Sequence, residues 1–250
     1  MLTKLNSYKA VVNEFNWHVP QDYNIAWDIC DKWVAESRRI ALMDETDDGV
    51  VRYFSFKDIY LFSNQLANVL SALGLERGDR VGILMPQRLE VAVTHLATYR
   101  SGAIAVPLFT LFGQDALQYR LKDSGARIVV TDTLGAATLA SIRDELPELR
   151  VVLNVDGAGD GTMDYQALLG RASDSFETVK TSSNDPALII YTSGTTGDPK
   201  GALLPHRTMI GHMPGVEFSH DFLGQKCDLI WSPADWAWIG GLIDVLFAAW

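Results

Sequence analysis

Short apolar runs alternate with amphipathic helical stretches through the middle of the chain, and this alternation restricts the fold more than any other feature. Strand-like runs lie at residues 80–85, 103–107, 127–131 and 150–155. The helical stretches between them lie at 89–99, 114–123 and 133–146. Alternation of this kind is typical of βαβ units, which build a parallel sheet with helices on its faces. The sequence therefore predicts an α/β fold with a parallel sheet flanked by helices.

The segments before this region predict a helix, a pair of strands and a second helix. Helical spacing of apolar residues spans 24–40, and two short strands are expected at 41–43 and 50–54. Ser55 followed by Asp58 resembles a capping box, so a helix is expected to begin there. Gly74 is the expected C-cap of that helix.

The segments after the βαβ region are expected to extend the sheet. Residues 202–204 and 229–231 predict short strands, and 206–215 predicts a helix. The run at 239–250 is apolar and helical, and it lacks a glycine cap, a basic last turn or a polar tail. We therefore expect the chain to be part of a longer protein. An exposed apolar end of this kind would favour self-association.

Composition and charge exclude several classes of protein. The 250 residues are 48% hydrophobic and 21% charged, which is globular composition, and the net charge of −10 argues against a nucleic-acid partner. No secretory signal and no transmembrane run is recognisable, which favours a cytoplasmic enzyme. Cys30 and Cys227 are the only cysteines, and neither has neighbouring ligands typical of a metal site, so we expect two reduced thiols.

The polar stretch from Thr192 to Gly201 carries the clearest chemical signal. An apolar run at 187–191, expected to be a buried strand, leads into it. Glycines let a ligand approach the backbone amides closely, hydroxyls add donors, and Lys200 adds a mobile positive charge. Converging donors with one cation are what a polyphosphate needs.

This stretch differs from the Walker A pattern at two positions. Pro199 stands at the second glycine, and Gly201 stands at the Mg²⁺-binding hydroxyl. Proline has no N–H to donate, so an ordinary phosphate-loop NTPase is a poor match. A flexible surface loop between two elements is the simpler alternative.

The stretch resembles the phosphate-loop signature of the adenylate-forming family, T-S-G-[ST]-T-G-x-P-K-G, at every position from Thr192 to Gly201. That family comprises acyl-CoA synthetases, adenylation domains of peptide synthetases and luciferases. The resemblance implies that this loop wraps the β- and γ-phosphates of ATP and that Mg²⁺ bridges phosphate oxygens. The implied nucleotide-binding residues are Thr192, Ser193, Gly194, Thr195, Thr196, Gly197 and Lys200.

Two further segments match the family less completely. His206 stands where the family often has a histidine facing the nucleotide and acyl site, which makes it the candidate catalytic residue; Pro205 replaces the usual serine or threonine before it. Asp235, Trp238 and Gly241 match a D-x-G-W-x-x-G segment of short- and medium-chain acyl-CoA synthetases, with Ala237 in place of the glycine. The resemblance implies that this segment lines the acid pocket. A capping or surface histidine and tryptophans packed in the core are the alternatives.

The resemblance implies an acid–thiol ligase that joins a carboxylic acid to CoA through an acyl-AMP. Residues 1–250 would form the N-terminal portion of its large domain, without the later adenine-, ribose- and lysine-bearing motifs. We therefore expect this chain alone to be inactive. A non-catalytic nucleotide-binding module and a phosphate-loop NTPase are the alternative functions.

Overall fold

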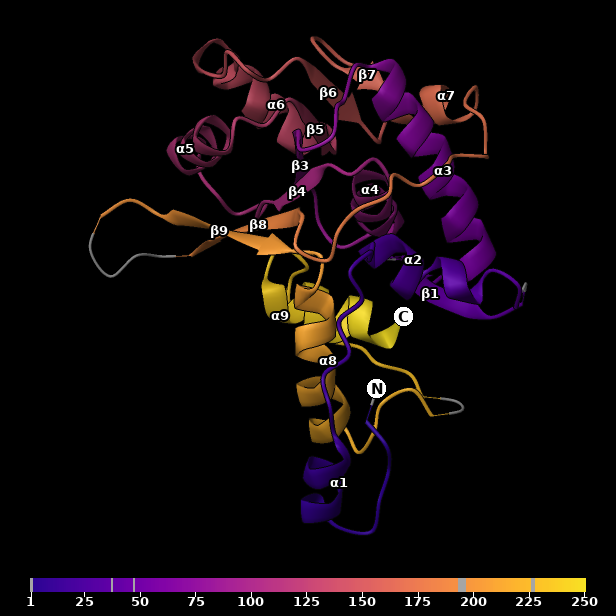
Figure 1. The fold of residues 1–250 in the computed structure, drawn as a ribbon. Coiled ribbons are helices and arrows are strands. Elements are labelled where there is room, and N and C mark those ends of the chain that lie inside the picture. Colours follow the sequence, from indigo (N-terminus) through magenta and orange to yellow (C-terminus); the bar gives the residue numbers. More distant parts are fainter. Residues whose placement is uncertain (1, 37, 47, 193–196, 226–227) are drawn as a thin grey trace.

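The computed structural model describes residues 2–36, 38–46, 48–192, 197–225 and 228–250. Its centre is a seven-stranded sheet in the order β7-β6-β5-β3-β4-β8-β9 (Figure 1). The strands are β3 (Arg80–Leu84), β4 (Ile104–Pro107), β5 (Ile128–Thr131), β6 (Val151–Asn154), β7 (Met163–Asp164), β8 (Pro186–Thr192) and β9 (Lys200–Pro205). All neighbouring strands are parallel except β8 and β9.

The predicted α/β architecture is confirmed, with one difference at the end of the sheet. β9 runs antiparallel to β8, with Thr192 opposite Lys200. The connection between these two strands is too short for the crossover that a parallel pair requires. The sheet is therefore mostly parallel, with one antiparallel hairpin at its edge.

Helices cover both faces of the sheet, as expected from the βαβ pattern (Figure 1). One core cluster joins the sheet to α3 (Phe56–Ala72) and α4 (Leu89–Arg100), while a second joins it to α5 (Gln114–Ser124) and α6 (Thr133–Ser141). A short helix, α7 (Tyr165–Leu169), follows β7 and contacts α3.

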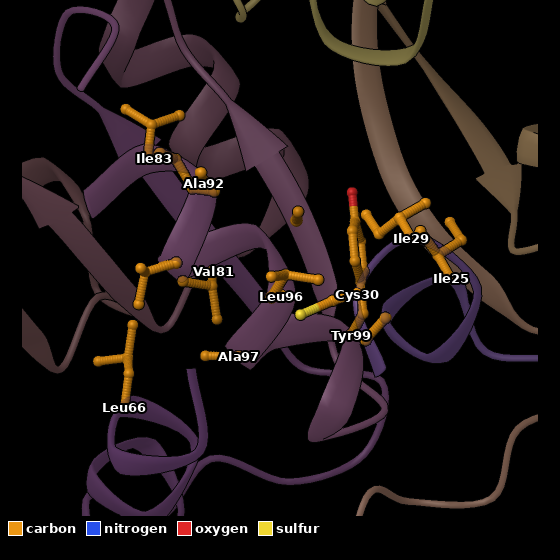
Figure 2. Close-up of a cluster of buried hydrophobic side chains, with 14 of the residues drawn as sticks. Ile25, Ile29, Cys30, Leu66, Val81, Ile83, Ala92, Leu96, Ala97 and Tyr99 are labelled. Atoms are coloured by element: carbon orange, nitrogen blue, oxygen red, sulfur yellow. The ribbon is translucent and has the colours of Figure 1, made fainter. Parts of the chain in front are cut away.

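The larger core cluster surrounds α4, whose residues from Val91 to Arg100 are all buried. In Figure 2 the side chain of Leu96 lies between Val81 of the sheet and Cys30 near α2 (Ile25–Ile29). Each fully buried aliphatic side chain of this kind stabilises the fold by about 1.5–3 kcal/mol. The core thus fixes the strands whose ends carry the candidate site.

The helix expected across 24–40 is wrong in its length. α2 ends at Ile29, where Cys30 has φ −132° and ψ −59°, and a single 3₁₀ turn, η1 (Asp31–Trp33), follows. Asp31 leaves the helical path because its carboxylate binds the buried guanidinium of Arg100, with Nη1 3.0 Å from Oδ2. A tertiary ion pair has overridden local helical spacing. α1 (Tyr8–Glu14) precedes α2 on the outside of the molecule.

The two strands expected at the N-terminal side and the cap of the next helix are confirmed. β1 (Ile40–Glu45) and β2 (Val51–Ser55) form an antiparallel pair. The Ser55 side chain accepts from Asp58 N, while the Asp58 carboxylate accepts from Ser55 N. α3 ends beside Gly74, whose φ of +81° is the left-handed conformation expected of a glycine C-cap.

The last part of the chain lies below the β8–β9 hairpin in the view of Figure 1. It contains α8 (Thr208–Ser219), the short α9 (Ile239–Gly241) and a π-helical segment, η3 (Leu242–Phe247). The strand expected at 229–231 is wrong, because that segment is irregular and its Leu229 and Trp231 side chains are 74% and 81% exposed. Within the described ranges, every helix falls short of the length and apolarity that a bilayer crossing requires.

Candidate functional site

The β8–β9 hairpin carries the candidate phosphate loop between its two strands. Thr192 ends β8, Lys200 begins β9, and both are exposed and paired across the ladder. Gly197 has φ +101°, a conformation that only glycine adopts without strain. The predicted binding residues Ser193, Gly194, Thr195 and Thr196 lie outside the described residues. The two ends of the loop are thus held beside each other at the edge of the sheet.

Tyr191 anchors the hairpin to α5. Its hydroxyl donates to the Asp123 carboxylate at 2.6 Å, and it lies 3.1 Å from the carbonyl oxygen of Arg120. Burial, followed by the hydrogen bond to Asp123 and its negative charge, raises the pKa of this tyrosine, so the hydroxyl stays protonated as a donor. A side chain at Gly201 would meet the Tyr191 ring at 3.2 Å and Ile189 Cγ2 at 2.9 Å, so the glycine allows the ring to lie over β9.

The carboxyl ends of three parallel strands meet at this edge of the sheet. Gln87 follows β3, Phe109 follows β4 and Thr192 ends β8. The segment Ala234–Trp238 is attached to the first two of these positions. Gln87 Nε2 donates to the Ala234 carbonyl at 2.8 Å, and the Trp238 ring packs edge-to-face on Phe109 at 5.1 Å. Ligands in open α/β sheets bind at this edge.

Aromatic contacts continue from Trp238 toward the β8–β9 hairpin. Phe109 packs on Phe112 at 5.4 Å, and the Arg120 guanidinium lies 4.0 Å from the centre of the Phe112 ring and 5.6 Å from that of Tyr191. Burial lowers the pKa of Arg120, whose Nε has no hydrogen-bond partner among the described residues. The structure thereby connects the predicted acid-site tryptophan with β8, the strand that leads into the candidate phosphate loop.

Asp235, Trp238 and Gly241 form one tight turn. Asp235 Oδ1 accepts from Ala237 N at 2.8 Å, and its carbonyl accepts from Trp238 N at 3.0 Å. A Cβ at Gly241 would lie 2.4 Å from the Asp235 carbonyl oxygen, so only glycine permits this close return. The turn leaves the Trp238 side chain 50% exposed. Asp235 therefore shapes the turn, while Trp238 presents a surface to solvent.

His206 lies apart from these exposed groups. Its side chain is fully buried, and Nδ1 accepts from the Ile25 backbone N–H at 3.2 Å. The ring packs edge-to-face on Tyr99 at 6.0 Å, and Nε2 has no hydrogen-bond partner among the described residues. Burial lowers the pKa of His206 to about 4, so the ring is neutral. This geometry supports a structural role at the base of the hairpin; the catalytic role stays a prediction.

The described residues hold no group of three histidine, cysteine or acidic side chains that could bind a metal by themselves. Mg²⁺ commonly keeps few protein ligands and is held largely by substrate phosphates. Lys200 and Thr192, a cation and a hydroxyl at an exposed edge, fit a magnesium–nucleotide phosphate tail better than a free metal ion.

Comparison with known proteins identifies the family. A family model described as AMP-binding enzyme matches residues 31–250. The chain belongs to the AMP-binding enzyme family. The resemblance inferred from the phosphate-loop motif is therefore confirmed.

Relatives of this AMP-binding chain are acyl-CoA and acetyl-CoA synthetases. It is 31% identical to acyl-coenzyme A synthetase ACSM4, mitochondrial, of Rattus norvegicus, over an alignment of 255 positions that covers 98% of this chain and 43% of that protein. It is 33% identical over 261 residues to acetyl-coenzyme A synthetase of Bacillus subtilis, covering 98% of this chain and 45% of the relative. The chain thus spans less than half the length of these curated relatives.

Solved structures agree in fold. The acyl-CoA synthetase of Brucella canis superposes with a TM-score of 0.86 at 28% identity, covering 98% of this chain and 46% of that chain. The anthranilate CoA ligase AuaEII, in complex with anthranoyl-AMP, gives a TM-score of 0.84 at 26% identity over 93% of this chain and 44% of that one.

Sequence reasoning missed several residues of this site. Phe109 and Gln87 could have been found from their positions directly after predicted strands, where ligand-binding loops of α/β sheets lie. Asp123 and Arg120 carry no such signal, because only the packing of α5 on the hairpin brings them to Tyr191.

Proposed function

We propose that the chain forms the N-terminal part of the large domain of an ATP-dependent acid–thiol ligase. The complete enzyme attaches a carboxylic acid to the α-phosphorus of ATP, releases pyrophosphate, and transfers the acyl group from AMP to the thiol of CoA. Membership of the AMP-binding family and the acyl-CoA synthetase relatives support this reaction.

The observation that carries the proposal is the β8–β9 hairpin at the carboxyl edge of the sheet. Thr192 and Lys200 face each other across the ladder and are both exposed, so the hydroxyl and the ammonium group can approach the same ligand. A Lys ammonium beside backbone amides neutralises phosphate charge as a mobile point charge. The loop from Thr192 to Lys200 would bind the β- and γ-phosphates, with Mg²⁺ bridging phosphate oxygens. This loop includes residues 193–196, which lie outside the described residues.

The acid would bind beside Trp238. The half-exposed indole of Trp238 packs on Phe109 and lies at the same edge of the sheet as the β8–β9 hairpin. The structurally similar CoA ligase AuaEII holds anthranoyl-AMP, which supports an acyl-AMP intermediate for this chain as well. Asp235 and Gly241 would act on the acid through the conformation of the turn that presents Trp238.

Residues 1–250 would supply only the phosphate and acid sides of the complete site. Positioning and charge neutralisation are the protein's main tasks in this reaction, and both require the whole substrate pair to be held. We therefore expect the 250-residue chain alone to form no acyl-AMP. Cytoplasmic location and self-association through the apolar end remain predictions from the sequence.

Acid-dependent exchange of labelled pyrophosphate into ATP tests the proposal in the full-length enzyme. Lys200→Ala removes a charge-assisted hydrogen bond worth about 1.5–3 kcal/mol, so kcat/KM for ATP should fall about tenfold to hundredfold. The matched control is Lys122→Ala, which removes an exposed lysine from α5 and should leave exchange unchanged. Wild-type enzyme that hydrolyses ATP equally well without any acid would reject the ligase function.

A further inference from the structure

The amide side chain of Gln87 joins the loop after β3 to the segment that carries Trp238. Its Nε2 donates to the Ala234 carbonyl oxygen at 2.8 Å, although the two residues are 147 positions apart in the chain. Residues 234–241, here called the acid-site turn, make no other hydrogen bond with the loops at this edge among the residues that the structure describes. The proposed reaction so far gives Gln87 no role.

Ion pairs anchor the loop that carries Gln87. The guanidinium of the next residue, Arg88, binds the Glu90 carboxylate at 2.7 Å and the Asp156 carboxylate at 3.0 Å. Asp156 in turn accepts from the backbone N–H of Thr133 at 3.0 Å. These bonds link the loops that follow β3, β5 and β6, so the backbone at Gln87 is tied to the carboxyl edge of the sheet.

The Ala234 carbonyl that accepts this bond lies inside the acid-site turn. A Cβ at Gly241 would lie 2.8 Å from the same oxygen, so the end of the turn packs directly against it. The Ala234 N–H donates to Ser232 Oγ at 3.1 Å, so both backbone polar groups of Ala234 are bonded. A displacement of Ala234 must therefore move the backbone on both sides of Trp238, whose ring contacts Phe109 at 5.1 Å.

We propose that Gln87 is a positioning residue of the acid site and that its hydrogen bond to Ala234 fixes the place of the Trp238 indole, which limits the size of acid accepted. This inference rests on the proposed ligase function, because it takes Trp238 as a wall of the acid pocket. Without the bond the turn can take several positions, so an acid that is one methylene too long is excluded less strictly. The β8–β9 hairpin is anchored separately, through Tyr191 and Asp123, so ATP binding does not depend on Gln87.

The size of the effect follows from the exposure of the bond. Gln87 is exposed and lines a surface groove together with Pro233 and Trp236, so water competes for the Ala234 carbonyl. A hydrogen bond between neutral groups in such a place contributes near the lower end of the usual range. Its loss should change a ratio of kcat/KM values about threefold.

The experiment uses full-length enzyme in the pyrophosphate-exchange assay. The probe acids are the straight-chain series from acetate to decanoate, together with benzoate and phenylacetate. The readout is the ratio of kcat/KM between the best acid and the acid that is one methylene longer. Because every probe carries the same carboxylate, a change of charge at position 87 affects all acids alike and cancels from this ratio.

Three substitutions separate the donor from the volume of the side chain. Gln87→Met and Gln87→Glu keep the length of the side chain but cannot donate, so the ratio should fall about threefold. Gln87→Lys keeps a donor that can reach the Ala234 carbonyl and should keep the wild-type ratio. KM for ATP should be unchanged in all three. Gln21→Met, which replaces an exposed glutamine before α2, is the matched control and should behave as wild type.

The outcomes separate the role of Gln87 from the ligase function. A wild-type enzyme that uses neighbouring acids equally well overturns the inference, and this arm requires no variant. An unchanged ratio in Gln87→Glu overturns it, and so does an equal fall in Gln87→Lys; both side chains suit an exposed position, so this pair suffices. A KM for ATP that rises together with the KM for the acid also overturns it. Absence of exchange by wild type with every acid rejects the ligase function itself.

Discussion

Replacing His206 should remove part of the acid sensitivity of the fold. The ring is buried and neutral, with a pKa lowered from 6.5 to about 4 by burial. A histidine with a depressed folded pKa stabilises the protein above the unfolded pKa of 6.5, and this contribution is lost as the pH falls toward 4. Substitution by a group that does not titrate must therefore flatten the dependence of stability on pH across this window.

The magnitude follows from the two pKa values. At pH 5 the unfolded chain binds a proton at this position almost completely, while the folded chain stays largely unprotonated. Linkage then gives a loss of about 2 kcal/mol of unfolding free energy between about pH 7.5 and pH 5 from this one group. His95 is also fully buried and adds to the acid sensitivity of the fold. Because wild type and both His206 variants contain it, its effect cancels when their unfolding free energies are compared.

Urea unfolding of wild type, His206→Asn and His206→Phe at several pH values measures this difference. Asparagine can still accept from the Ile25 N–H, whereas phenylalanine leaves that donor unpaired at a cost of about 1–3 kcal/mol at every pH. Between about pH 7.5 and pH 5, the unfolding free energy of both variants should nevertheless fall by about 2 kcal/mol less than that of wild type. The exposed His18→Asn serves as control. If acidification lowers the unfolding free energy of wild type and of both variants equally, the result would refute a buried, neutral His206 and favour an accessible, catalytic ring.

Two further predictions concern the turn and the buried thiol. Gly241→Ala places a methyl group against the Asp235 carbonyl oxygen, so we expect about 1–3 kcal/mol of destabilisation and a raised KM for the acid. Urea unfolding measures the first effect and exchange kinetics the second. A variant with wild-type values for both would contradict the close approach of Gly241 to Asp235. Burial raises the pKa of Cys30 to about 12, so iodoacetamide at pH 8 should modify it only in denaturant, as read by peptide mass spectrometry. Rapid modification of Cys30 in the folded protein would show that the site is open.

Regular elements with local signals were predictable from the sequence. The Ser55–Asp58 cap, the glycine after α3 and the alternating strands all depend on residues close together in the chain, and the structure contains them. The helix across 24–40 fails because Asp31 pairs with Arg100, a partner on another helix. Local periodicity carries no information about such distant partners.

The candidate site was likewise predictable from the sequence only where its signal is local. The motif from Thr192 to Gly201 identified the family because its residue types lie in one short run. The burial of His206 could not be inferred from its place in the motif, since its acceptor role depends on a backbone amide of α2. The contact of Trp238 with Phe109 likewise arises from the order of strands in the sheet, which the alternating pattern alone leaves open.

The antiparallel strand β9 also has a consequence for the behaviour of the protein in concentrated solution. It is the outermost strand of the sheet, with mostly exposed side chains that include Leu203 at 55%. An uncovered strand edge of this kind can recruit strands from other molecules, and a lysine on the edge is one of the devices that oppose such growth. We therefore expect Lys200 to oppose association through this edge, separately from its proposed part in phosphate binding, and light scattering should accompany any study in which it is replaced.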